Sequence, residues 1–184
     1  CKTVSLTCES VSEFPGDLKF PNLKLLKLMH GDKMLRFSQD FYEGMEKLQV
    51  ISYHKMKYPL LPSSPQCSTN LRVLLLHQCL LTFDLSSIGN FPNLEVLSFA
   101  GSRVNRLPST IGNLKKLKLL DLTGCVNLRI DDGVLKNLVE LEELYMRVVD
   151  KKAIRFTNSN RAELAELSKQ LSALEVELFD DNGI

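Results

Sequence analysis

Several features that would point directly to a function are missing from this sequence. Its 184 residues contain no tryptophan and no apolar run near the roughly 18 residues that span a bilayer. The first residues do not show the pattern of a secretory signal peptide. The formal net charge is only +1, so the overall charge favours neither nucleic acid nor a membrane as a partner. With 44% hydrophobic and 24% charged residues, the composition is that of a soluble globular protein.

Motifs of enzymes and of cofactor-binding proteins are also absent. The sequence contains no GxSxG, HExxH, GxGxxG or Walker A motif. The basic run at 115–118 (KKLK) has no aromatic residues interleaved with it, so it does not predict a nucleic-acid site. We therefore expect a protein that is not an enzyme, with no catalytic and no cofactor-binding residues in this chain.

The five cysteines do not form a disulfide framework or a metal-binding pattern. Their number is odd, and no two have the CxxC spacing. None of the asparagines stands in an N-x-Ser/Thr glycosylation site. Reduced thiols and unglycosylated asparagines are typical of the cytosol, so we expect a cytoplasmic protein.

Short segments recur at a regular spacing along the chain. Residues 87–91 (SIGNF) return 23 residues later at 110–114 (TIGNL), and 20–23 (FPNL) return at 91–94. Aligned on these segments, the chain follows the frame L-x-x-L-x-L-x-x-(N/C). Eight copies of this frame begin at Cys1, Leu23, Leu48, Leu71, Leu94, Leu117, Leu141 and Leu171.

The spacing of the copies identifies the type of repeat. Successive copies are 22, 25, 23, 23, 23, 24 and 30 residues apart. All but the last distance fall in the range of about 20–29 residues that is typical of leucine-rich repeats. We therefore predict an α/β fold, a leucine-rich-repeat solenoid with a curved parallel β-sheet on its concave face and loops and short helices on its convex face. Residues 1–184 form one domain of about eight repeats, and we expect both ends to be cuts through a longer chain.

The alternation of a strand assigns each residue of the frame to a face. Residues two apart share a face, so the second and third leucines of each copy point into the core. Leu97, Leu120 and Leu144 should accordingly be almost inaccessible. The 30-residue spacing contains an insertion, in which leucines at helical spacing predict a short convex helix near 158–167, reached by a polar loop from 150 to 158.

The residues between the inner leucines form three outward columns across the strands. The first column has five consecutive apolar members, and exposed apolar patches tend to mark contact sites. His54 and His77 share the third column on adjacent strands. The column's next members, Met29 and Ala100, supply no further ligand, so we expect no metal site.

We take the outward residues of the central and late strands as candidates for binding a protein. Tyr145 and Arg147 are the strongest of them, because tyrosine and arginine are over-represented among the residues that dominate binding energy. The candidates are Val73, Leu75, His77, Val96, Ser98, Asp121, Thr123, Tyr145 and Arg147.

Three stretches of the sequence resemble a known family. Residues 41–51 (FYEGMEKLQVI) are similar to the FFxGMxxLxVL stretch of early repeats in plant coiled-coil, nucleotide-binding, leucine-rich-repeat disease-resistance receptors. Residues 107–125 are similar to their LPxxIGxLxxLxxLDLxxC stretch, and 141–146 to their LEELYM. Together these stretches resemble in particular the resistance-candidate family of lettuce and its relatives.

The resemblance implies a regulatory and a recognition function. In that family the repeats hold the nucleotide-binding core inactive and take part in sensing a pathogen effector or a guarded host protein. The sequence has no nucleotide-binding domain, so ADP or ATP is expected only in that missing part of the parent protein. Lys27 and Lys33, in the more basic early repeats, are candidates for contact with that domain.

Alternative functions differ in features outside the repeat frame. The substrate-recognition repeats of an F-box-type ubiquitin ligase also use L-x-x-L-x-L-x-x-C coils, but this sequence has no F-box, and the segment upstream would decide between the two. An extracellular receptor would carry G-x-I-P turns and glycosylation sites, and neither occurs. We expect the chain alone to be monomeric or weakly self-associating.

Overall fold

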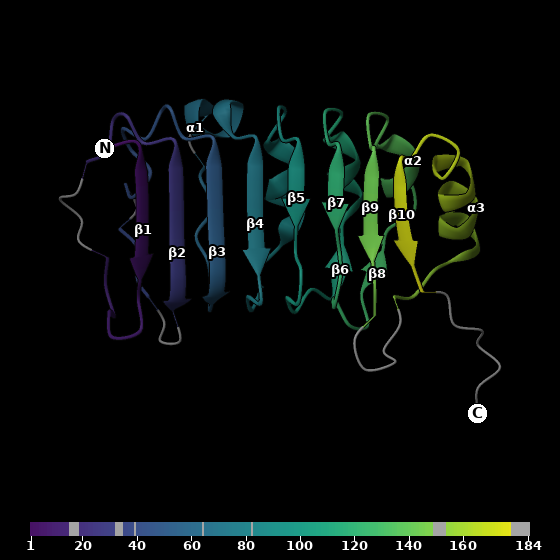
Figure 1. Cartoon of the computed structure of the whole chain (residues 1–184), viewed down its shortest axis with the longest axis horizontal. Coiled ribbons are helices and arrows are strands. Elements are labelled where there is room, and N and C mark those ends of the chain that lie inside the picture. The colour runs from purple at the N-terminus through teal and green to yellow at the C-terminus, as the bar shows by residue number, and fades with distance from the viewer. Residues whose placement is uncertain are drawn as a thin grey trace.

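The computed structural model describes residues 1–14, 19–31, 35–38, 40–63, 65–81, 83–148 and 154–177. Eight parallel strands lie side by side in one sheet, in the order β1-β2-β3-β4-β5-β7-β9-β10, and the helices lie behind it (Figure 1). Because helices need about 8–10 Å between axes and strands only about 4.8 Å, the strand side is the inner, concave side. The predicted leucine-rich-repeat solenoid is confirmed.

The elements alternate between the two sides of each coil. The strands of the main sheet are β1 Thr3–Thr7, β2 Leu25–Gly31, β3 Val50–Met56, β4 Val73–His77, β5 Val96–Ser98, β7 Leu119–Asp121, β9 Glu143–Met146 and β10 Ala173–Val176. The remaining elements are β6 Arg106–Leu107 and β8 Arg129–Ile130, which pair with each other, the helices α1 Pro65–Asn70, α2 Val134–Asn137 and α3 Asn158–Leu167, and the 3-10 helices η1 Leu85–Asn90 and η2 Ser109–Asn113.

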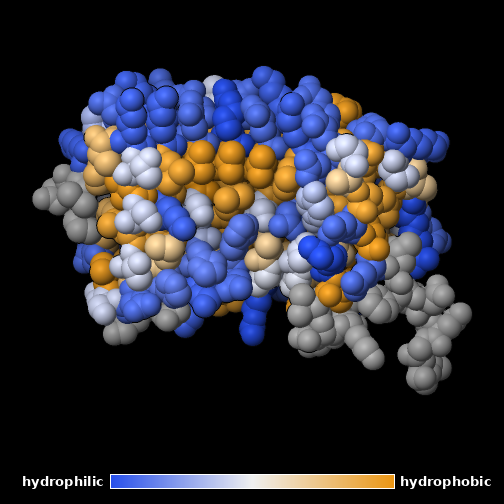
Figure 2. Space-filling view, viewed as in Figure 1, coloured by the Kyte–Doolittle hydropathy of each residue, from blue (hydrophilic) through white to orange (hydrophobic). Residues whose placement is uncertain are grey.

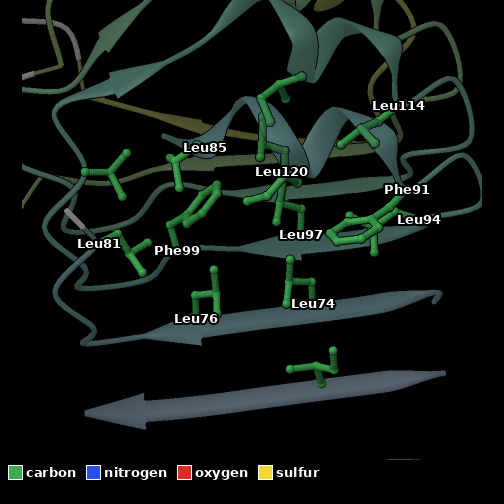
Figure 3. Packing of buried hydrophobic residues seen from close by; sticks show 14 of the residues in the cluster. Leu74, Leu76, Leu81, Leu85, Phe91, Leu94, Leu97, Phe99, Leu114 and Leu120 are labelled. Carbon is green, nitrogen blue, oxygen red and sulfur yellow. The ribbon is translucent and has the colours of Figure 1, made fainter. Parts of the chain in front are cut away.

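The core consists of rows of buried side chains that run across the coils, with one residue from each coil in a row. Leu74, Leu97 and Leu120 come from neighbouring strands, pair in register and are completely buried (Figure 3). Leu144 continues this row on β9 and is equally inaccessible, as predicted. Each coil leaves its inner edge open until the next coil stacks on it, so stability is shared between neighbours.

Leucines at the two ends of the stack are only partly covered. Leu6 on β1 and Leu174 on β10 occupy the same inward positions as the central leucines, yet they are 38% and 40% exposed. A core position is therefore fully buried only when a coil packs on both of its sides.

The recurring glycines of the IGN segments allow the convex turns to stack closely. A Cβ added to Gly89 in η1 would lie 2.9 Å from both the carbonyl carbon and the Cβ of Thr110 in η2. A Cβ added to Gly112 would lie 2.9 Å from the Cβ of Asn137 in α2. Because carbon atoms need about 3.5–4.0 Å, these distances account for the repetition of glycine every 23 residues.

Polar side chains at repeated positions satisfy the backbone of the preceding coil. The Ser102 hydroxyl accepts a hydrogen bond from Cys79 N (2.8 Å) and donates one to Leu76 O. Asn93 of the second FPNL segment donates to Thr69 O at 2.9 Å. The Ser102 bonds give buried backbone groups their partners, as buried polar groups require, and the Asn93 bond joins two coils at the surface.

The predicted insertion helix is confirmed as α3. Thr157 caps the helix, and Thr157 and Asn160 form a reciprocal capping box. Glu163 lies on this convex helix and is nevertheless buried. Its carboxylate accepts hydrogen bonds from Gly133 N (2.6 Å) and Lys136 N (3.2 Å) at the start of α2, and so joins the last two convex helices. The polar loop expected from 150 to 158 lies mostly outside the described residues.

Candidate interaction surface

The register of the sheet assembles the three outward columns as the repeat frame predicted. The first column is Thr3, Leu25, Val50, Val73, Val96, Leu119, Glu143 and Ala173. The second is Ser5, Lys27, Ser52, Leu75, Ser98, Asp121, Tyr145 and Glu175. The third begins with Thr7, Met29, His54 and His77. No described segment crosses in front of these columns (Figure 1).

The first column forms an apolar stripe across five neighbouring strands. Its members are Leu25, Val50, Val73, Val96 and Leu119, and each is partly exposed. The stripe appears as an orange band across the central strands, beneath a hydrophilic rim at the strands' N-terminal ends (Figure 2). On that rim Arg72 pairs with Glu95 at 3.6 Å and Lys118 with Glu142 at 3.3 Å, so charges on the rim largely offset one another.

A hydrogen-bonded chain links three candidate residues in the centre of the face. Nε2 of His77 lies 2.8 Å from the hydroxyl of Ser98, which donates to Oδ2 of Asp121 at 2.9 Å. The other carboxylate oxygen of Asp121 accepts from the backbone N–H of Thr123 at 2.9 Å. Ser98 itself is only 3% exposed, so it holds its neighbours in position and offers little surface of its own.

Histidine, serine and aspartate together suggest hydrolytic chemistry, but the order of the hydrogen bonds does not fit it. A nucleophilic serine gives its proton to a histidine base. Here the hydroxyl hydrogen of Ser98 goes to Asp121, so the Nε2–H of His77 is the donor to the serine oxygen. Burial lowers the pKa of His77, while Asp121 raises it and His54 lowers it to smaller extents. The neutral imidazole acts as a fixed donor on the surface.

The histidines gather more closely than the repeat frame indicated. His54 and His77 are paired across β3 and β4, as predicted. His30 has a positive φ of 58°, which brings its ring to 5.7 Å from that of His54, edge to face. Among the described residues, no group of three or more His, Cys, Asp or Glu side chains is arranged to hold a metal ion.

The late strands carry an aromatic side chain among carboxylates. The hydroxyl of Tyr145 donates to Oε2 of Glu143 at 2.6 Å. This hydrogen bond is the main cause of a raised pKa for Tyr145, and burial and the charges of Glu143, Glu175 and Asp121 add to it. Tyr145 therefore stays protonated and keeps its hydrogen directed at Glu143.

Arg147 is tied to the last strand. Its Nε lies 2.8 Å from Oε2 of Glu175, and the two side chains are 63% and 44% exposed. The pair is open to solvent, where an ion pair contributes little stability and can exchange partners.

Of Lys27 and Lys33, the two candidates for contact with the nucleotide-binding domain, the structure describes only Lys27. Lys27 lies in the second column on β2 and is half-buried. Lys33 lies outside the described residues. The other candidates share the concave face, spread over β4 to β9 and the turns that follow β7 and β9.

Two residues that complete the late part of the face were left out of the candidate set. Glu143 and Glu175 hold Tyr145 and Arg147 in place. Both stand in the outward columns, so the repeat frame located them. Their roles follow from the two hydrogen-bond and ion-pair contacts, which alternation alone does not give.

Comparisons with solved structures identify the same architecture in other proteins. A leucine-rich-repeat protein of Leptospira interrogans superposes with a TM-score of 0.62 and 21% identity, over 95% of this chain and 48% of that one. InlP of Listeria monocytogenes gives a TM-score of 0.53 and 23% identity, over 74% of this chain and 39% of that one. At these identities the likeness shows the fold.

Comparison of the sequence with curated proteins indicates a more specific relationship. The chain is similar to Disease resistance protein RPS4B of Arabidopsis thaliana, with 26% identity over 201 residues. The match includes 95% of this chain but only 16% of the length of RPS4B. No model of a protein family matches the chain. None of the helices in the described part of the chain combines the length and apolar character needed to cross a membrane.

Proposed function

We propose that this solenoid is the recognition module of an intracellular plant immune receptor, and that its concave face binds a pathogen effector or a host protein that the receptor guards. The observation that carries the proposal is the unbroken register of eight strands with an uncovered face. The resemblance of the repeats to disease-resistance receptors and the similarity to RPS4B support it.

The size of the face suits a protein partner. Three outward side chains on each of eight strands give about two dozen residues, comparable with the roughly 20–30 residues on one side of a standard protein–protein interface. The columns of the described strands run across the ladder in one layer, an arrangement that suits an extended protein surface better than the concave pocket that a small molecule requires.

The polar residues on this face are held in place before a partner arrives. Asp121 accepts two hydrogen bonds, and the hydroxyl of Tyr145 is directed at Glu143. Groups that are already ordered lose less conformational entropy on binding, and so retain more of their interaction energy.

A second part of the proposal concerns regulation. Lys27 is the only formally charged residue in the outward columns of β1 to β5 that the structure describes. We assign it to contact with the nucleotide-binding domain of the same receptor, which would keep the receptor inactive. ADP or ATP would bind to that domain and not to the repeats.

The test uses the full-length receptor that contains this chain, expressed in leaves and challenged with the pathogen that activates it. Tyr145→Ala and Arg147→Ala should each abolish the cell-death response at normal protein levels, and Lys27→Glu should cause cell death without the pathogen. Lys136→Ala, an exposed change on convex α2, is the matched control. If Lys136→Ala abolishes the response and the concave changes do not, the concave face is not the recognition surface.

A further inference from the structure

We propose that the segment bound on the concave face combines aliphatic side chains with arginine or lysine residues, and that its basic end lies over β7 to β10. The inference rests on the proposed function and adds the chemistry and the direction of the partner. It follows from the distribution of side chains along the columns, in which apolar residues lie on the early and central strands and most charged residues on the late strands.

The early and central strands supply the apolar part of the site. Val50, Val73 and Val96 are adjacent in register and flanked by Leu25 and Leu119. Leu75, in the second column between Ser52 and Ser98, widens the stripe at its centre. Covering partly exposed aliphatic side chains contributes about 25 cal/mol for each Å² removed from water, so this part favours aliphatic groups on the partner.

The late strands carry a net negative charge. Asp121, Glu143, Glu175 and Glu177 occupy their outward positions, and Arg147 is the one basic residue among the described members. Four acidic groups and one basic group leave a net charge of −3. The hydrogen bonds to Asp121 come from Ser98 and a backbone N–H, and the bond to Glu143 comes from Tyr145. These donors are neutral, so they orient the carboxylates without cancelling their charge.

The opposite end of the ladder differs in sign. Over β1 to β5 the described outward columns carry Lys27 and no carboxylate. Six strand-to-strand steps separate β2 from β10, which is about 29 Å at roughly 4.8 Å per step. An extended segment of about nine residues crosses that distance at about 3.3 Å per residue. The difference in charge between the two ends of the face therefore orients such a segment, with its basic end toward β10.

A basic segment also fits the cost of covering the carboxylates. Burying a carboxylate without a counter-ion is unfavourable. An apolar partner would cover Glu143 with only the neutral Tyr145 hydroxyl as its donor, and an acidic partner would oppose both Glu143 and Glu175 with like charge. A guanidinium can bind a carboxylate through two hydrogen bonds and stack on an aromatic ring. Tyr145, between Asp121 and Glu175 in register, supplies that ring.

The probe for this inference is a library of random peptides about twelve residues long, displayed on phage and selected on the purified 184-residue chain. The wild-type chain should enrich peptides that combine aliphatic residues with arginine or lysine. Selection on Glu143→Lys/Glu175→Lys should enrich acidic residues instead. The control Glu140→Lys/Glu166→Lys, which places the same charge change at exposed sites off the columns, should select as the wild type does.

Binding of a selected peptide then measures the two parts separately. Glu143→Gln/Glu175→Gln should weaken binding about tenfold, because two exposed charge pairs with the peptide are lost. Val73→Ser/Val96→Ser should weaken it while leaving its dependence on salt unchanged. Raising NaCl from about 50 mM to about 500 mM should weaken wild-type binding several-fold.

Three outcomes would overturn the inference. These are peptides with no preference for basic residues, no selection above the background of the library, or self-association of the chain that Val73→Ser/Val96→Ser abolishes. The last would make a second copy the occupant. The receptor assay distinguishes failure of this inference from failure of the proposed function. If cell death depends on Tyr145 but not on the acidic residues, the inference is wrong and the proposed function stands.

Discussion

Replacing Gly89 with alanine tests how closely the convex turns are stacked. An added Cβ would stand 2.9 Å from two carbon atoms of Thr110 in the next coil, and closer still to its carbonyl oxygen. Two of these three atoms belong to the backbone, which cannot rotate away, so the two coils must separate locally. Overpacking of this kind costs about 1–3 kcal/mol.

The sign of the effect distinguishes this account from the alternative. Where alanine fits, a glycine-to-alanine change stabilises a protein by about 0.4–1 kcal/mol, because the unfolded chain loses freedom. With the steric conflict the change should be destabilising. For a chain of this size about 1 kcal/mol corresponds to about 2–4 °C, so we expect the Tm of Gly89→Ala to fall by roughly 2–12 °C.

Two other glycines supply the comparison. Gly112→Ala also meets a fixed neighbour, the Cβ of Asn137 at 2.9 Å, and should lower the Tm. Gly31→Ala would meet the Sδ of Met56 at 2.6 Å, but that atom is near the end of a flexible side chain that can move. Thermal melts followed by circular dichroism should rank Gly31→Ala as the mildest change. A Gly89→Ala chain that melts at or above the wild-type temperature would refute the reasoning.

Four further predictions concern the core, the convex cap, one histidine and the ends of the stack. Leu120→Ala, at a completely buried site, should cost about 2–5 kcal/mol in urea unfolding, and a loss below about 1 kcal/mol would contradict the assigned frame. Glu163→Gln turns an amide N–H toward the backbone donors of α2 and should cost about 1–3 kcal/mol by the same assay. Burial lowers the pKa of His77 below 6.5, so the contribution of the neutral imidazole to stability is complete above that pH and is lost as the pH falls through the folded-state pKa. His77→Gln should remove this part of the pH dependence of the urea midpoint. An unchanged pH profile in this variant would count against the prediction. Hydrogen exchange should be faster in residues 1–14 and 160–177 than in the central coils, and uniform protection would contradict the role of stacking.

The repeat frame was sufficient to predict the sheet and its columns. Leucines 23 residues apart must fall in one row if each coil packs on the next, and alternation then sends their neighbours outward. The pairing of Val73 with Val96 and of Asp121 with Tyr145 followed from this without any further information.

The features that could not be predicted depend on side chains from different coils. Ser98 stands at an outward position, but its short side chain is enclosed by its hydrogen-bonded neighbours His77 and Asp121. Glu163 lies on the same helical face as Asn160 and Leu164, yet a charged residue on that face becomes understandable only when the unpaired N–H groups of α2 are seen opposite it. The sequence pattern therefore predicts the face on which a residue lies, whereas its burial and its hydrogen-bond partner depend on the neighbouring coil.

The constancy of the strand register has a consequence for how such a surface can change. Repeat copies range from 22 to 30 residues, yet Ala173 still pairs with Glu143 after the longest of them. The longest copy contains α3, and the register of the strands on either side of it is unchanged. The backbone of each column can therefore keep its place when a side chain is substituted, while side chains that contact one another, such as His77, Ser98 and Asp121, change together. The concave face can therefore accommodate a new partner through point substitutions, while insertions lengthen the convex side.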